Sequence, residues 1–283
     1  MLYAMKGFFL TLAILLSVSL THAIEPQDSL LIATAKWHTI TKFGGITHKR
    51  AHIEGLYGST QSINLVEIPR SRKSEFGISG NNGMRKTSQQ AAEQNAVAAI
   101  NGTYYDMKVG NSACFYKIDG EVIDSTLRSE FQGRVNGAIK ITKGKLQIIK
   151  WSPEIESTHN GRRGTILASG PILIRDGKME EWSQFSESFI LTRHPRSVIF
   201  TKKDNTVVML TIDGRSRGNA DGMSIPELAE LAKALGAENA INLDGGGSTT
   251  LWMKDGGILN YPCDNRRYDH EGERSVSNII YVK

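Results

Sequence analysis

The sequence is poor in the residues that build metal centres and disulfide frameworks. Its 283 residues include two cysteines, Cys114 and Cys263, and no C-x-x-C pair. Two thiols are too few for a thiolate zinc site, and the chain has no dense cluster of Asp and His that would suit a metal-dependent hydrolase. A single disulfide is permitted in an exported protein, and the sequence leaves open whether these two cysteines pair.

Runs of a single charge and long apolar runs are also scarce. The net charge is +5 without any polybasic run, which argues against a nucleic-acid partner. The marked apolar run, residues 7–20, is too short for a comfortable membrane span. With Lys6 before it and Ala23 at the expected cleavage point, it predicts a signal peptide over residues 1–23, and an uncleaved anchor is the alternative. We therefore expect an exported protein, periplasmic or secreted, with no stable membrane anchor after cleavage.

The residues that are abundant favour a fold rich in strands and turns. Glycine accounts for 28 residues, and short apolar or alternating runs separated by turn residues predict many hairpins. No repeat, low-complexity segment or linker interrupts the chain. We predict an α+β or mixed α/β fold: a single domain with a mixed β-sheet core and a few packed helices. An N-terminal β-rich region, residues 24–90, is expected to continue into the motif-bearing region, residues 91–283.

The first part of the chain carries no motif, so only local patterns guide its interpretation. Residues 24–60 are predicted to form hairpin strands, and the alternation over residues 61–68 predicts another strand. The polar, glycine-containing stretch 71–85 is predicted to be a loop. A helix is expected to begin after Thr87 or Ser88 as its N-cap.

The most informative stretch is residues 239–253. A short apolar strand ends at Asp244, three consecutive glycines follow at Gly245–Gly247, and Ser248 comes next. Adjacent glycines lose much conformational entropy on folding, but they permit positive φ and close approach of a ligand. Successive exposed N–H groups in such a loop can form an anion-binding nest. A tight turn with an Asp cap is the alternative, and the triple glycine followed by Ser favours a site.

A second acidic residue follows a strand in the same part of the chain. Residues 206–212 read as a buried strand that ends at Asp213. The next helix begins with Ser224 as its N-cap, and Glu227 completes a capping box. If the strands before Asp213 and Asp244 are parallel, both carboxylates lie at the same end of one sheet.

Two further segments suit a sugar-phosphate ligand. Residues 101–106, Asn-Gly-Thr-Tyr-Tyr-Asp, follow a predicted strand, and their aromatic pair and acid suit the wall of a sugar pocket. An ordinary Asn-Gly turn is the alternative. Residues 193–196, Arg-His-Pro-Arg, carry two guanidinium groups, and each can bind two oxygens of a phosphate or carboxylate group. A solvated basic loop is the alternative.

In their order along the chain, these motifs resemble the phosphodiester glycosidase family. The resemblance spans residues 96–282, and its most specific part is the stretch 242–248 with the capped helix before it. Thr103 departs from the pattern, because the family usually has a second glycine there. The other matching motifs are Asn101-Gly102 with Tyr104, Tyr105 and Asp106, Ser169-Gly170-Pro171 with Asp176-Gly177, Arg193 with Pro195-Arg196, Asp213-Gly214-Arg215, and Glu273-Arg274 with Ser277-Asn278.

The resemblance implies an enzyme that hydrolyses the glycosidic bond of a sugar-1-phosphodiester, releasing free sugar and a phosphomonoester. No cofactor is expected to be required, and clustered Asp106, Asp213 and Asp244 leave room for a structural calcium ion. Asp213 and Asp244 are the first candidates for the catalytic carboxylates, with Asp106 and Glu273 in reserve. The candidate substrate-binding residues are Asn101, Gly102, Tyr104, Tyr105, Gly170, Arg193, Arg196, Arg215, Asn242, Gly245, Gly246, Gly247, Ser248, Arg274 and Asn278.

Two other functions remain open at this point. A noncatalytic phosphoglycan-binding protein would present the same cationic and aromatic groups without turnover. A metal-dependent phosphodiesterase would cut the P–O bond instead of the glycosidic bond, although the scarcity of clustered Asp and His residues counts against it.

Overall fold

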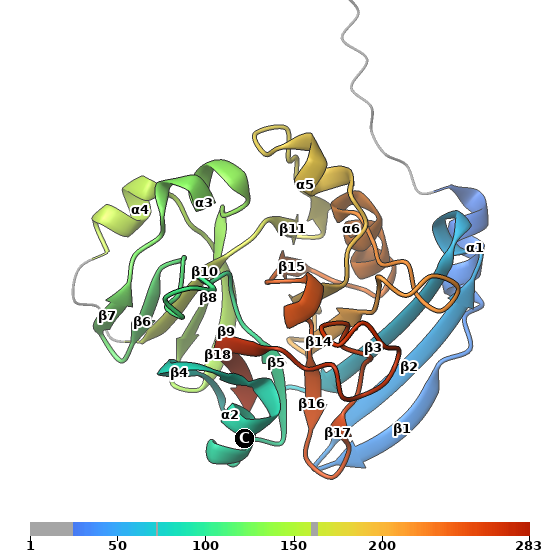
Figure 1. Ribbon diagram of the computed structural model, residues 1–283, viewed down its shortest axis with the longest axis horizontal. Coiled ribbons are helices and arrows are strands. Elements are labelled where there is room, and N and C mark those ends of the chain that lie inside the picture. Colours follow the sequence, from blue (N-terminus) through green and yellow to red (C-terminus); the bar gives the residue numbers. More distant parts are fainter. Residues whose placement is uncertain (1–24, 72, 160–163) are drawn as a thin grey trace, which may run out of the picture.

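The computed structural model describes residues 25–71, 73–159 and 164–283. The signal peptide predicted for residues 1–23 lies outside them. The described residues form three antiparallel sheets and six helices (Figure 1), which confirms the predicted α+β class. No helix in these ranges is long and apolar enough to cross a membrane.

The largest sheet has eight strands and includes the strand that leads to Asp244 and the three glycines. Its strands, in spatial order, are β1 (His38–Phe43), β2 (Ile46–Glu54), β3 (Thr60–Ile68), β14 (Val207–Ile212), β13 (Arg196–Thr201), β15 (Asn239–Asn242), β11 (Ile172–Arg175) and β12 (Lys178–Met179). Strands β14 and β15 both pair antiparallel with β13, which lies between them. They therefore run in the same direction, and the chain reaches Asp213 and Asp244 at the same end of the sheet.

Two five-stranded sheets complete the framework. One has the order β7 (Glu121–Asp124), β6 (Tyr116–Ile118), β10 (Thr165–Ser169), β8 (Gly137–Thr142) and β9 (Lys145–Lys150), and the other β17 (Gly257–Ile258), β16 (Leu251–Met253), β5 (Ala98–Asn101), β18 (Ser275–Val282) and β4 (Phe76–Lys86). The chain passes from β10 in a small sheet to β11 in the large sheet through Gly170-Pro171. Pro171, which has no N–H to donate, therefore stands where the chain leaves one sheet for the other.

Alternation along the central strands divides the core into two layers. Val198 and Phe200 of β13 pack in the cluster that contains helix α6 (Ile225–Ala234), together with α1 (Pro26–Ala33) and α5 (Glu187–Leu191). Ile199, between them, points to the opposite face and packs against the two smaller sheets. Figure 1 shows the helices α5 and α6 on one side of the large sheet and the smaller sheets with α2, α3 and α4 on the other.

The remaining short helices cover the small sheets. Helix α2 (Thr87–Glu93) packs on the sheet that contains β5 and β18, while α3 (Arg128–Gly133) and α4 (Pro153–Ser157) lie near the sheet that contains β6 and β10 (Figure 1). The capping box predicted for α6 is present. The Ser224 N–H donates to Glu227 Oε2 at 2.8 Å, and the Ser224 hydroxyl accepts the Glu227 N–H.

The prediction for the start of the chain was wrong. Residues 26–33 form helix α1 instead of a hairpin strand. Pro26 at the first helical position and Asp28 in the first turn are local signals that favour the start of a helix here. Strands begin only at His38.

Two predictions for residues 71–88 were also wrong. Residues 71–85 were expected to be a loop, but residues 76–86 form β4, which pairs with β18 along its length. Its polar, glycine-containing sequence hides the strand because long-range pairing, and not alternation, holds it in place. The N-cap of α2 is Lys86, one residue before the predicted Thr87 or Ser88.

The two cysteines are both free thiols. Cys114 is buried in the cluster between α3 and the second sheet, whereas Cys263 is partly exposed in the loop that precedes β18. Burial raises the pKa of both thiols. The question that the sequence left open is therefore answered against a Cys114–Cys263 disulfide.

Candidate functional site

The Asp244 backbone joins the two motifs that are farthest apart in the sequence. Asp244 follows β15, and its N–H donates to the carbonyl of Gly102 at 3.1 Å. In return, the side-chain amide of Asn101 donates to the Asp244 carbonyl at 2.7 Å. The end of β5 in one sheet is thereby fixed to the end of β15 in another, and the Asp244 side chain lies at this junction.

Asn101 and Gly102 serve as packing and hydrogen-bonding elements beneath the site. The side-chain oxygen Oδ1 of Asn101 accepts the Ser197 hydroxyl at 2.7 Å and the Thr250 N–H at 3.1 Å. A Cβ atom on Gly102 would lie 1.9 Å from Oδ1 of Asn278. Only glycine fits there, because β18 passes too close for a side chain.

Asn242 and Tyr104 form a buried network with Gly170. The Asn242 amide donates to the Tyr104 hydroxyl and to the Gly170 carbonyl, each at 2.9 Å. The Tyr104 hydroxyl donates to the same carbonyl at 2.6 Å. Burial raises the pKa of Tyr104, so its hydroxyl stays protonated. Its ring is 3% exposed, which leaves no open face for the sugar stacking that the sequence suggested.

Tyr105 is the aromatic residue that remains accessible beside Asp244. Its hydroxyl donates to the Ser275 carbonyl at 3.0 Å and lies 3.5 Å from the Ser248 hydroxyl. Burial raises the pKa of Tyr105, and the negative charge of Asp244 adds to this effect. Tyr105 and Ser248 therefore form one polar side of the site.

The Asp244 carboxyl group is a weaker acid than an ordinary aspartate. Burial raises its pKa from the ordinary 3.8 to about 6, although a hydrogen bond from Ser248 and the charges of Arg134 and Arg274 act in the opposite direction. Asp244 as a whole residue is still partly exposed. A carboxyl group that changes charge near neutral pH is suited to chemistry at that pH.

Arg134 is a member of the site that the sequence analysis missed. It follows α3 directly, and its guanidinium carbon lies 3.7 Å from the centre of the Tyr104 ring. Its Nε donates to Oε2 of Glu130 at 2.6 Å. Burial lowers the pKa of Arg134, but the Glu130 hydrogen bond and electrostatic interactions with Tyr104, Glu130 and Asp244 together raise it more, so the net pKa is raised. No motif marks this residue, so sequence alone offered no signal for it.

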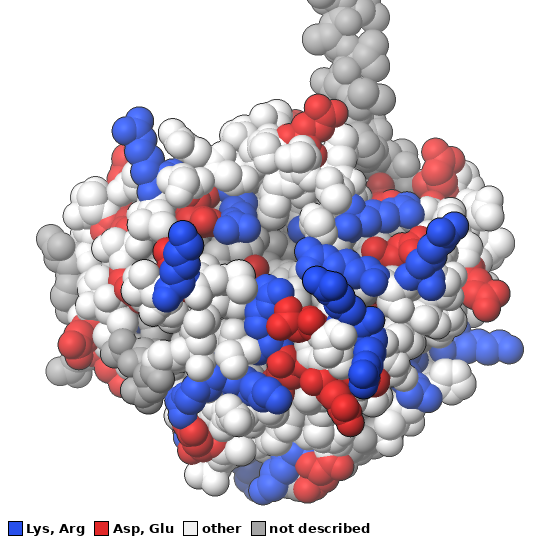
Figure 2. Space-filling model, viewed as in Figure 1, with Lys and Arg blue, Asp and Glu red and all other residues white. Residues whose placement is uncertain are grey.

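Arg215 and Arg274 lie against the glycine loop from two directions. A Cβ atom on Gly246 would approach Nη2 of Arg215 to 3.0 Å, and one on Gly247 would overlap the Arg274 guanidinium. Arg274 is held by Asp264, to which its Nε donates at 2.8 Å. Figure 2 shows that Lys and Arg side chains gather around a hollow on this face of the molecule. The glycines thus make room for guanidinium groups.

The backbone amides of the glycine loop are largely used within the protein. The Gly245 N–H donates to the Asp244 carboxylate at 3.0 Å, the Gly246 N–H to the Pro195 carbonyl at 2.9 Å, and the Ser248 N–H to the Gly245 carbonyl at 3.2 Å. These three donors do not form the open anion nest that the sequence suggested. Anion binding at this site therefore depends on guanidinium groups.

The arginines of the Arg193–Arg196 segment are bound to the protein itself. Arg193 Nε donates to Glu227 Oε1 at 3.0 Å. Arg196 is buried, and its guanidinium donates to the carbonyls of Met223 at 2.8 Å and Thr192 at 2.9 Å. Burial lowers the pKa of Arg196 to about 10. These contacts hold the segment against α6 and leave neither guanidinium directed at Asp244.

Asp213 lies at the same sheet end as Asp244 but holds a loop in place. Its Oδ2 accepts the Ser62 hydroxyl at 2.7 Å, and its Oδ1 accepts the Asn260 amide at 3.0 Å and the Tyr261 N–H at 2.8 Å. The side chain is 1% exposed, and burial raises its pKa. These bonds join β3 to the loop over residues 260–272.

The two reserve acids also have local partners. Asp106 Oδ1 accepts the Lys108 N–H at 2.7 Å and so stabilises a turn, while Glu273 accepts the Ser88 N–H and hydroxyl, each at 2.7 Å, at the start of α2. Across residues 25–71, 73–159 and 164–283, no group of three or more His, Cys, Asp or Glu side chains is arranged to hold a metal ion. The three aspartates considered for calcium do not form such a group.

In this fold, the Asp244 carboxylate lies at a junction of antiparallel sheets, among the guanidinium groups of Arg134 and Arg274. The profile of the phosphodiester glycosidase family matches residues 94–283. This match covers more than half of the chain, and the protein belongs to the phosphodiester glycosidase family.

Individual relatives agree with this assignment. The chain is 25% identical over 166 residues to mouse N-acetylglucosamine-1-phosphodiester alpha-N-acetylglucosaminidase, covering 58% of this chain and 29% of the relative. The solved catalytic domain of the zebrafish enzyme of that name superposes with a TM-score of 0.64 at 19% identity, covering 88% of this chain and 87% of that one. A Burkholderia pseudomallei structure, described only as a candidate exported protein, has a TM-score of 0.60 at 13% identity, covering 80% and 75%. At these identities the structures show a shared fold. The chain spans less than a third of the mouse relative.

Proposed function

We propose that the protein hydrolyses the glycosidic bond of a sugar-1-phosphodiester, with Asp244 as the carboxylate that acts at the anomeric carbon. The observation that carries the proposal is the raised pKa of Asp244, about 6, in a site whose charges include Arg134 and Arg274. Family membership supplies the reaction class, and the curated relatives named for N-acetylglucosamine-1-phosphodiesters suggest an N-acetylhexosamine as the sugar.

The charges of the site suit each partner in this reaction. A phosphodiester carries a single negative charge, which Arg215 and Arg274 are placed to bind beside the glycine loop. As the bond between the anomeric carbon and oxygen breaks, positive charge develops on the sugar, and ionised Asp244 stabilises it. The leaving phosphomonoester needs little protonation. Water adds its oxygen to the anomeric carbon and its proton to the phosphate product, which completes the balance.

The bond that is cut can be identified with isotopically labelled water. Methyl N-acetylglucosamine-1-phosphate would be incubated with the protein in ¹⁸O-water, and the phosphate product analysed by mass spectrometry. Glycosidic cleavage leaves methyl phosphate without ¹⁸O, whereas cleavage of the P–O bond places ¹⁸O in the phosphate. Binding without any product would favour the noncatalytic phosphoglycan-binding alternative, and labelled phosphate would favour the phosphodiesterase.

We further propose that the protein acts outside the cytoplasm. The apolar segment over residues 7–20 and the structural neighbour described as a candidate exported protein support export. Expression of the full chain in a bacterial host, followed by N-terminal sequencing of the protein from the periplasm and medium, tests this. A mature N-terminus near Ile24 is expected, and recovery of only full-length cytoplasmic protein would contradict the proposal.

A further inference from the structure

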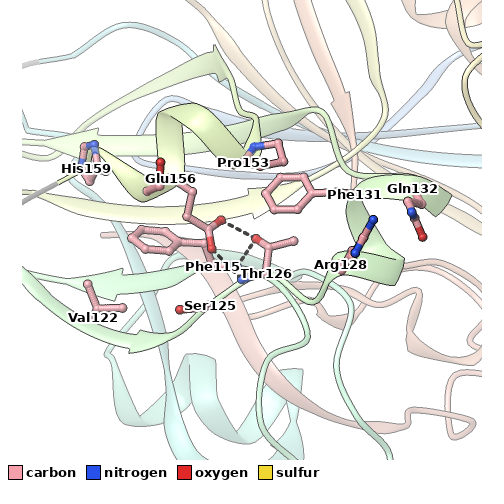
Figure 3. A pocket seen from close by; sticks show the side chains of 11 residues that line it. Phe115, Val122, Ser125, Thr126, Arg128, Phe131, Gln132, Pro153, Glu156 and His159 are labelled. Atoms are coloured by element: carbon pink, nitrogen blue, oxygen red, sulfur yellow. Dashed lines mark hydrogen bonds between the residues drawn. The ribbon is translucent and has the colours of Figure 1, made fainter.

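One cavity lies beside helix α3 and apart from the glycine loop. Its volume is about 690 Å³, within the range of sites for small organic ligands. Two aromatic rings, Phe115 and Phe131, face it together with Glu156, and Arg128 and Gln132 of α3 stand at its side (Figure 3). None of the family motifs supplies these residues.

The polar part of this cavity is held rigidly. The Glu156 carboxylate accepts the Thr126 N–H at 2.9 Å, the Thr126 hydroxyl at 2.6 Å and the Trp151 indole N–H at 2.7 Å. A carboxylate has about four acceptor positions, so three bonds leave one for a ligand hydroxyl. In Figure 3 this carboxylate lies between Phe115 and Phe131. Phe115 is 3% exposed and packs against Trp151, so it forms the floor of the cavity. A fixed acceptor beside the half-buried Phe131 ring suits a sugar, which presents C–H groups to that ring and a hydroxyl group to the acceptor.

The cavity is connected to the Asp244 site through one packed cluster. Tyr104, Phe115 and Phe131 belong to the same hydrophobic cluster. Arg134, which covers Tyr104 and lowers the pKa of Asp244, follows α3 and pairs with Glu130 of that helix. Helix α3 therefore links the two sites, because Arg128, Phe131 and Gln132 of this helix line the cavity and Arg134 at its end acts on Asp244.

We propose that this cavity is a second subsite that binds a neighbouring sugar unit of a phosphoglycan whose scissile phosphodiester lies at Asp244. Phe131, which is half-buried, contacts the sugar ring, Glu156 accepts a hydroxyl, and exposed Arg128 meets the next phosphodiester charge. This inference rests on the proposed function, because it assigns the substrate as a polymer of phosphodiester-linked sugars.

The test compares two ligands on four proteins, one with the unaltered subsite and three variants. The ligands are methyl N-acetylglucosamine-1-phosphate and a synthetic trimer of N-acetylhexosamine units joined by 1-phosphodiester links. Ser125→Trp would fill the cavity from an exposed position without removing a packed side chain, and Arg128→Ala would remove its cation. Arg70→Ala, at an exposed position that lines another pocket, is the matched control for charge. Dissociation constants are measured by calorimetry in an Asp244→Asn background, so turnover is not needed.

The expected result is that the trimer binds the unaltered subsite more tightly than the monomer, and that Ser125→Trp and Arg128→Ala each weaken trimer binding roughly tenfold. Monomer binding should stay unchanged in both, and Arg70→Ala should affect neither ligand. Equal affinity for trimer and monomer, unchanged trimer binding in both variants, or an equal loss for both ligands would overturn the subsite. If the protein with Asp244 intact released no product, the proposed function would be overturned separately, because binding is measured independently of turnover.

Discussion

Asn101 and Asp244 are joined by a hydrogen bond from the Asn101 side-chain amide to the Asp244 carbonyl, 2.7 Å long. The two residues are 143 positions apart, and they lie at the ends of strands in different sheets, Asn101 in β5 and Asp244 after β15. This bond places Asp244 beside a buried amide network. The geometry of the site is therefore fixed by the packing of two sheets, and Asp244 is the group whose removal is the most informative.

Replacing Asp244 by Asn is expected to lower kcat by about 10²- to 10⁴-fold while the protein stays folded. The amide keeps the shape of the side chain but carries no charge to stabilise the anomeric carbon. Release of free N-acetylglucosamine from its methyl phosphodiester measures the effect. Asp213→Ala is the contrasting variant, since it removes the acceptor of Ser62, Asn260 and Tyr261. We expect it to lower the free energy of unfolding by about 2–4 kcal/mol. A fully active Asp244→Asn protein would contradict the assignment.

The pH dependence of kcat/KM should follow the ionisation of Asp244. Because its pKa is about 6 and the ionised form is the active one, kcat/KM is expected to rise about tenfold per pH unit up to pH 6 and then level off. Arg134→Met should move the midpoint to higher pH, since the Arg134 charge lowers this pKa. Arg175→Met, which removes an exposed guanidinium paired with Glu180, is the control and should leave the midpoint unchanged. A profile that falls with rising pH through 6 would show that the protonated acid is the working form.

The same ionisation links stability to pH. The pKa of Asp244 is raised on folding from 3.8 to about 6, so its favourable contribution is complete below pH 3.8 and is lost as the pH rises through 6. Asp244→Asn has no such group to ionise. We expect the variant to be more stable than the wild type at pH 7 by about 1–3 kcal/mol, and this excess to shrink toward pH 4. Urea unfolding of both proteins at several pH values measures the difference. A stability difference that is constant from pH 4 to pH 7 would argue against the raised pKa.

The arginines should separate into substrate-binding and structural groups. Arg215→Ala is expected to raise KM for the phosphodiester roughly 10- to 100-fold with little change in thermal stability, because its guanidinium lies against the glycine loop. Arg193→Ala breaks the ion pair with Glu227 at the start of α6. It should lower the melting temperature and leave KM unchanged. Melting curves and steady-state kinetics on both variants test this, and the reverse assignment of effects would place the phosphate near Arg193.

Much of the framework could be predicted from local sequence. The capping box at Ser224 and Glu227 identified α6, and the apolar runs before Asp213 and Asp244 identified β14 and β15. These signals succeed because helix caps and buried strands depend on residues close together in the chain. Strand β4 and helix α1 were missed, since pairing with β18 holds the first and only a few start signals mark the second.

The candidate site could be predicted only in part. The glycine loop, Asp244, Arg215 and Arg274 were identified, and the structure brings them together. Arg134 escaped notice because a short helix, far from the glycine loop in sequence, carries it to the site. From the sequence alone, Arg193, Arg196 and Asp213 were equally good candidates for the site. In the structure, each is bound to partners within the protein.

The sequence by itself determined the family, the strand ends that carry Asp213 and Asp244, and the glycines that admit guanidinium groups to the central loop. These properties depend on motif order, on periodicity and on the absence of a Cβ atom. Only the tertiary structure decided that Asp244 lies among arginine charges whereas Asp213 is enclosed by the hydrogen-bond donors Ser62, Asn260 and Tyr261, because these neighbours are distant in the chain. Two aspartates at the same sheet end thus acquire different properties from their surroundings.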